Sequence, residues 1–159
     1  MAVLAACALA AGCSSGSEAV VKGRDSAEVK EDVEKASSRV LEMLALKGKV
    51  TEVGAMTARC ADYDANDKIY RARHPWSVYE VPFADLQKAM DRLRGELPKN
   101  GWRVVKDGVD GSVGKSSQII AESNGRELAL DVRLHKANSS ENSPDFLEVT
   151  VESACYRAE

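Results

Sequence analysis

Histidine is scarce in this chain, which has only His74 and His135 among its 159 residues. Two imidazoles so far apart in the sequence do not form a metal site, and no cysteine accompanies them at the spacing of metal ligands. An excess of positive charge is also missing, since the formal net charge is −3. These absences remove the usual signs of a metalloprotein and of a nucleic-acid-binding protein. We therefore expect no metal, no cofactor, no catalytic residue and no nucleic-acid partner.

The chain also lacks an apolar run long enough to cross a bilayer as a helix, which takes about 20 residues. An uncharged, alanine-rich run covers residues 1–11 and is followed by Gly12, Cys13 and a polar Ser-Ser-Gly segment. A short apolar run before small residues is typical of a secretory signal. The cysteine directly after Ala-Gly resembles the lipobox of bacterial lipoproteins, in which the thiol receives a diacylglyceryl group and the cysteine becomes the first mature residue.

This resemblance implies that Cys13 carries lipid and that residues 1–12 are a signal segment. No basic residue precedes Lys22, so we expect the natural signal to begin further upstream. Residues 13–24 are rich in Ser, Gly and Glu, which is typical of a flexible tether. Residues 25–159 have the length of a single domain. The expected location is the outer face of the cell membrane. The alternatives for the N-terminal segment are an ordinary cleaved signal and a buried alanine-rich helix.

Two cysteines remain after the lipidated one, Cys60 and Cys155. An even pair in an exported chain predicts a disulfide, and the alternative is a thiol nucleophile or a metal ligand. A disulfide requires both cysteines at the same end of the domain, so the first and last strands should run in the same direction. The segment 61–82 is long enough to carry the chain back along the domain between them.

Two segments have the apolar spacing of amphipathic helices. Asp25 can cap the first one, with Glu28 as the second half of a capping box, and Gly48 marks its end. The second begins after Pro82 and stops at Pro98. The apolar stripes are Val29, Val33, Ala36, Val40 and Leu44 in the first helix, and Phe83, Leu86, Met90, Leu93 and Leu97 in the second.

Alternating apolar and polar residues predict five strands, at about 50–60, 102–107, 119–122, 127–135 and 147–155. Asn124 and Gly125 predict a two-residue hairpin turn, which would place Ala121 opposite Leu128. Only one face of this sheet is apolar. The sequence therefore predicts an α+β domain, a two-layer sandwich with a mainly antiparallel five-stranded sheet and two amphipathic helices on one face.

The segment 61–82 shows no regular pattern, and long irregular loops in small domains often carry binding sites. Arginine and aromatic residues dominate interface hot spots. The segment therefore predicts a possible binding patch, which requires an exposed tryptophan. The alternative is that Trp76 and Tyr79 fold back over the end of the sandwich. The patch consists of Arg71, Arg73, His74, Trp76 and Tyr79.

Two segments resemble parts of ligand-binding motifs. Residues 62–67 place oxygen ligands like those at the start of a calcium loop, but Asp67 stands where the turn needs Gly and Arg73 where the bidentate Glu belongs. Residues 108–116 end in Gly-Lys-Ser like a phosphate loop, but the preceding glycine has the wrong spacing and no helix follows. We expect a polar loop in the first case and a flexible connection in the second.

Several stretches resemble one family of exported proteins. They are residues 9–15 (Leu-Ala-Ala-Gly-Cys-Ser-Ser), 73–79 (Arg-His-Pro-Trp-Ser-Val-Tyr), 97–102 (Leu-Pro and Gly-Trp at its ends) and 151–156 (Val-Glu-Ser-Ala-Cys-Tyr). With these stretches the chain resembles the small lipoproteins that actinomycetes export, over most of its mature length. The resemblance implies export and the shape of the domain, and it implies no activity.

Three functions fit these expectations. The first is a non-catalytic, membrane-anchored domain that binds an unknown protein, cell-wall or small-molecule partner. The second is a carrier of an apolar small ligand, which requires a sizeable cavity between the sheet and the helices. The third is an envelope enzyme, which requires a cleft where ionisable side chains converge, with His74, Asp62 and Asp64 as the candidates.

Overall fold

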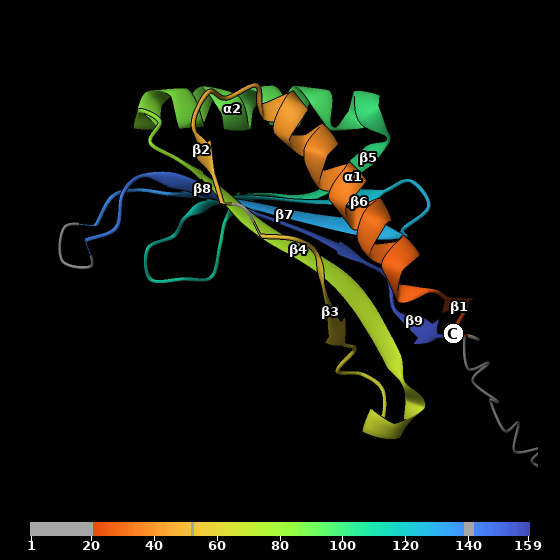
Figure 1. Cartoon of the computed structure of the whole chain (residues 1–159). Helices are drawn as coiled ribbons and strands as arrows, with labels where there is room; N and C mark the ends of the chain where they lie inside the picture. Colours follow the sequence, from red (N-terminus) through yellow and green to blue (C-terminus); the bar gives the residue numbers. More distant parts are fainter. Residues whose placement is uncertain (1–20, 52, 139–141) are drawn as a thin grey trace, which may run out of the picture.

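The computed structural model describes residues 21–51, 53–138 and 142–159. These residues form an α+β fold in which two α-helices lie on one face of a large, mostly antiparallel sheet (Figure 1). The helices are α1 (Ser26–Leu44) and α2 (Phe83–Glu96), and two short 3₁₀ helices are η1 (Ala65–Asp67) and η2 (Pro98–Asn100). The strands are β1 (Gly23–Arg24), β2 (Lys49–Val50), β3 (Met56–Arg59), β4 (Ile69–Tyr79), β5 (Trp102–Val109), β6 (Ser117–Ser123), β7 (Leu128–His135), β8 (Phe146–Ser153) and β9 (Tyr156–Ala158). The expected signal segment and Cys13 lie outside the described residues.

Helix α1 begins where the sequence predicts. The Asp25 carboxylate accepts hydrogen bonds from the backbone N–H groups of Ala27 and Glu28. These bonds satisfy two of the donors that a helix leaves free at its N-terminus. The predicted apolar stripe is buried along its whole length, at Val29, Val33, Ala36, Val40 and Leu44.

The C-terminus of α1 comes before the expected Gly48. Ala45 adopts the left-handed conformation, with φ 48°, and its N–H bonds back to the carbonyl groups of the last turn. The Leu44 carbonyl accepts a hydrogen bond from the Arg92 guanidinium of α2. Helix α2 itself follows Pro82, as predicted, and buries Leu86, Ala89, Met90 and Leu93.

The sheet has nine strands in the described residues, so the expected five-stranded sheet is wrong. Its main order is β1-β9-β4-β8-β7-β6-β5, with β2 and β3 also paired to β4. The pairs are antiparallel except for β1 with β9. Gly23 and Arg24, expected at the end of the tether, form β1. Residues 50–60, expected as one strand, form β2 and β3, and residues 69–79, expected as part of a loop, form β4 in the middle of the sheet.

Strand β4 was hidden in the sequence by its charged residues and by Pro75. A proline lacks the N–H that a central strand needs for the ladder. Pro75 pairs with Thr150 of β8 on one side. On the other side it lies between the part of β4 that pairs with β3 and the part that pairs with β2. No strand pairs with Pro75 on that side, so no ladder hydrogen bond there needs the N–H that proline lacks.

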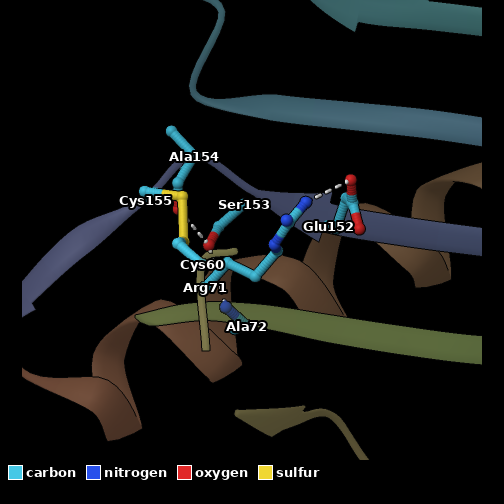
Figure 2. The surroundings of a disulfide bond; sticks show 7 residues. All are labelled: Cys60, Arg71, Ala72, Glu152, Ser153, Ala154 and Cys155. Atoms are coloured by element: carbon cyan, nitrogen blue, oxygen red, sulfur yellow. Dashed lines mark hydrogen bonds and ion pairs between the residues drawn. A yellow bond between two sulfur atoms is a disulfide. The ribbon is translucent and has the colours of Figure 1, made fainter. Parts of the chain in front are cut away.

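The disulfide between Cys60 and Cys155 is confirmed, with a Cα–Cα distance of 6.3 Å. Strands β3 and β8 are both antiparallel to β4, so they run in the same direction and end near each other, as the disulfide requires. Figure 2 shows Ser153 beside the bond, where its hydroxyl accepts from the Ala72 N–H at 2.9 Å and donates to the Ala154 carbonyl at 2.7 Å. The Ser153 side chain thus satisfies a backbone donor of β4 at the point where β4 stops pairing with β8 and begins to pair with β9.

The β6–β7 hairpin forms at the predicted place, but its register is shifted by two residues. Ala121 lies opposite Leu130 instead of Leu128. The turn spans residues 124–127, and Arg126, not Asn124 or Gly125, takes the positive φ of 56°. An even shift keeps every side chain on its predicted face. Leu130 and Val132 therefore still face the helices.

Apolar side chains of α1, α2 and the inner face of the sheet form one core. A disulfide of this kind indicates an oxidising environment outside the cytoplasm. Within the described parts of the chain, neither helix combines the length and the apolar character that a membrane span needs.

Candidate functional site

The residues of the predicted binding patch do not lie together, because all of them belong to β4 and successive side chains of a strand point to opposite faces. His74 and Trp76 lie on the face toward the helices, whereas Arg71, Arg73 and Tyr79 lie on the other. Trp76 is only 4% exposed and is part of the core. The condition for a patch centred on Trp76 is therefore not met, because the tryptophan packs in the core from within a strand.

The arginine residues of β4 are already bound to an acidic neighbour. The Arg71 guanidinium donates to the Glu152 carboxylate of β8 at 3.0 Å, and Arg73 lies 4.0 Å from the same carboxylate. Figure 2 shows the Arg71–Glu152 pair close to the disulfide. The two guanidinium groups thus share one carboxylate.

The ionisable residues proposed for an enzyme are also apart. Asp64 and Asp67 form a capping box around η1, with the Asp64 carboxylate accepting from Asn66 N–H and the Asp67 carboxylate from Asp64 N–H. Their oxygens serve the turn itself. His74 lies five residues along β4 from Ile69, or about 16 Å at about 3.3 Å per residue, and its Nε2 bonds to the Val53 carbonyl. Among the described residues, no cluster of His, Cys, Asp or Glu side chains could hold a metal ion.

The glycine-rich segment 108–116 is held by its own carboxylate. Asp110 accepts hydrogen bonds from the hydroxyl and N–H groups of Ser112, at 2.6 and 3.1 Å, and from the Ser116 N–H at 3.1 Å. The Ser112 hydroxyl bond is the main cause that lowers the pKa of Asp110, with the backbone bonds and the Arg133 charge acting in the same direction. Two amides of this segment, those of Ser112 and Ser116, are thus occupied by Asp110.

A different site emerges between α1 and the β6–β7 turn. A cleft of about 430 Å³, here called the α1–turn cleft, lies between these two walls and is closed at one end by β1 and β9. Its volume is within the range of small-molecule sites. The side chains that give it its chemistry are Arg24, Asp32, Lys35, Arg39, Glu127 and Tyr156.

Helix periodicity explains the first wall of the α1–turn cleft. Asp32, Lys35 and Arg39 are three and four residues apart, so they follow one side of α1 beside its apolar stripe. Ala36 lines the cleft between them. The second wall exists because the turn is longer than predicted and brings Glu127 and Leu128 to the cleft.

The charges in the cleft differ in how well they are paired. Arg24 donates to Asp32 at 2.9 Å and lies over the Tyr156 ring at 5.3 Å. The bond to Asp32 is the main cause that raises the pKa of Arg24 above its usual value. Lys35 lies 2.6 Å from Glu31, and this bond raises the pKa of Lys35.

Arg39 and Glu127 have no such partners. Neither side chain forms a hydrogen bond or an ion pair with any other residue that the structure describes, and both are exposed to solvent. They come from opposite walls, because Arg39 belongs to α1 and Glu127 to the turn. The cleft therefore presents one free cation and one free anion to a ligand.

A second cleft of about 360 Å³ lies on the other side of the same turn. It shares Gly125, Glu127 and Tyr156 with the α1–turn cleft and extends to Lys22 and Cys155. The turn thus separates two hollows, one of them beside the disulfide.

No protein-family model, curated protein or solved structure matches the chain.

Proposed function

We propose that this protein is an exported, lipid-anchored, non-catalytic binding domain whose ligand occupies the α1–turn cleft. The observation that carries the binding role is the pair of unpartnered charges, Arg39 and Glu127, on opposite walls of a cleft of about 430 Å³. These two charges are unpaired and line the same cleft, whereas the arginine residues of β4 are already paired with Glu152.

Export is supported by the disulfide, because such bonds persist outside the reducing cytoplasm. The lipid anchor is supported by the position of Cys13 directly after an apolar run and Ala-Gly. Two acyl chains on one residue hold a protein firmly at a membrane surface, since each buried CH₂ contributes about 0.8 kcal/mol.

The alternatives have less support. Side chains between the helices and the sheet are fully buried, including Leu86, Leu130 and Leu147, so an apolar carrier would need the layers to separate. The enzyme alternative relied on His74 with Asp62 and Asp64, but Asp64 caps η1 and His74 bonds to Val53 further along β4.

The anchor is tested with protein from its native host. Mass spectrometry of the N-terminal peptide should show a diacylglyceryl mass on Cys13, and Cys13→Ala should move the protein out of the membrane fraction. A mature protein that is unmodified at Cys13 and recovered without membranes would contradict lipidation while leaving the binding role open.

The binding role is tested by NMR screening of the domain against a library of small fragments. Shift changes should cluster at residues lining the α1–turn cleft. Gly125→Trp should abolish them, because Gly125 lines the cleft and nothing within 3.8 Å obstructs a side chain there. Gly111→Trp is the matched control, since its side chain would enter open space in the 108–116 segment. Fragments that bind elsewhere, or in both variants alike, would contradict the proposed site.

A further inference from the structure

The two walls of the α1–turn cleft carry opposite free charges. Arg39 on the α1 wall and Glu127 on the turn wall do not pair with each other or with any other described residue. The remaining charges are neutralised locally, Arg24 by Asp32 and Lys35 by Glu31. A ligand that enters the cleft therefore meets one unpaired guanidinium and one unpaired carboxylate.

We propose that the α1–turn cleft binds a small zwitterion, namely an amino acid or a short peptide with free termini. The ligand carboxylate pairs with Arg39 and the ligand ammonium group pairs with Glu127. This inference rests on the proposed function, because it assigns a ligand class to the same cleft.

Other ligand charges fit the cleft less well. A simple anion would be attracted by Arg39 and repelled by Glu127, and a simple cation would experience the reverse. An apolar ligand would displace water from both charged groups without offering hydrogen bonds in its place, which costs free energy. A zwitterion satisfies both walls at once. The guanidinium suits a carboxylate especially well, because its fork of N–H donors can bind both oxygens.

The cleft also has an apolar component between the charged walls. Leu128 is half-buried at the base of the turn, and Ala36 and Val29 of α1 line the same cleft. Tyr156 closes the end of the cleft next to Arg24. A ligand with an apolar side chain between its two charged ends therefore matches the lining, and the volume of about 430 Å³ accommodates a molecule of that size.

The test is an NMR titration of the domain with four related probes. The first is alanyl-leucine with both termini free. The second is its N-acetyl form, which lacks the cation, and the third is its C-terminal amide, which lacks the anion. The fourth is blocked at both ends. The free dipeptide should bind in the cleft, and removal of either charge should weaken binding about tenfold, as expected for the loss of one charge-assisted contact.

Substitutions in the protein give the decisive pattern. Arg39→Gln should weaken binding of the free dipeptide about tenfold but should not weaken binding of the amide, since the amide has no carboxylate to lose and its cation is repelled by Arg39. Glu127→Gln should weaken binding of the free dipeptide to the same extent and should not weaken binding of the N-acetyl form, which has no ammonium group to lose. Lys88→Gln on α2, which is exposed and outside the cleft, is the control and should change nothing.

Each contrary result has a definite meaning. If the four probes bind with equal affinity, or if none binds while library fragments still bind in the cleft, the zwitterion inference is wrong and the cleft remains a binding site. If neither the probes nor the fragments bind there, the proposed function fails as well. Equal losses for all probes in Arg39→Gln would mean that Arg39 shapes the cleft without contacting a carboxylate, which also overturns the inference.

Discussion

The two faces of β4 are formed by the same run of residues, yet they have opposite roles. Toward the helices, Tyr70, Ala72, Trp76 and Val78 are at most 8% exposed and belong to the core. On the other face, Arg71 and its neighbours stay partly exposed and form ion pairs with β8. A stretch that looks like one binding patch in the sequence is thus divided into a packing surface and a charged surface.

This difference shows where the stability of the fold resides. Burial of apolar surface contributes about 25 cal/mol per Å², and the inner face of β4 is almost wholly buried. Exposed ion pairs contribute about 0–1 kcal/mol each, because water and salt screen them. The outer face is therefore free to change with little effect on folding, and the inner face is not.

The largest expected effect comes from Trp76→Ala. Truncating a buried tryptophan leaves a cavity and should lower the free energy of unfolding by about 3–5 kcal/mol. Arg73→Ala on the outer face is the matched control, since Arg73 is half-exposed and has one distant ion pair, and it should cost less than about 1 kcal/mol. Urea denaturation of both variants measures the difference. Equal effects would show that the two faces of β4 do not differ as described.

A somewhat smaller effect is expected from removing the disulfide with Cys60→Ser and Cys155→Ser together. The bond joins the two strand ends that flank β4 and closes a loop between residues separated by 95 positions. Its loss should lower the free energy of unfolding by about 2–4 kcal/mol, chiefly by freeing the unfolded chain. Thermal melting of the variant and of the reduced wild type should agree, and an unchanged melting temperature in both would contradict this stabilising role.

The sequence predicted those elements whose apolar pattern and end signals lie within the element itself. Helices α1 and α2 carry their apolar stripes and N-terminal signals locally, and β7 and β8 alternate regularly. Strand β4 was missed because Pro75 and His74 interrupt its alternation and because its central position depends on pairing with distant strands. The disulfide was predictable, since it followed from the number of cysteines and the expected export.

The cleft was not predictable from the same patterns. Its charged residues on α1 look like an ordinary solvated helix face in the sequence. Its second wall depends on the register of the β6–β7 hairpin, where the Asn124 N–H bonds to the Gly101 carbonyl and Arg126 takes the positive φ. A turn of the predicted length would have placed Glu127 inside the strand. The spacing of Asp32, Lys35 and Arg39 was the only local sign of the site.

The smallest of the three expected stability losses concerns Asp110. It shows that a charged residue with contacts on the outer face can also stabilise the fold. Its side chain is 6% exposed, accepts bonds from Ser112 and Ser116, and lies 4.0 Å from Arg133 on the outer face. These contacts lower the pKa of Asp110 in the folded protein. The ionised carboxylate therefore stabilises the fold. Its contribution is complete above the unfolded-state pKa of about 3.9 and is lost as the pH falls through the lower folded-state pKa.

Asp110→Asn should thus be less stable than the wild type at pH 7, and the difference should shrink as the pH falls below about 4. The loss at pH 7 should be smaller than that from removing the disulfide. Urea denaturation from pH 2 to pH 7 measures it, with Asp62→Asn, an exposed aspartate of the η1 loop, as the control that should follow the wild-type profile. A constant difference at every pH would mean that the shape of the Asp110 side chain, and not its charge, holds the 108–116 segment.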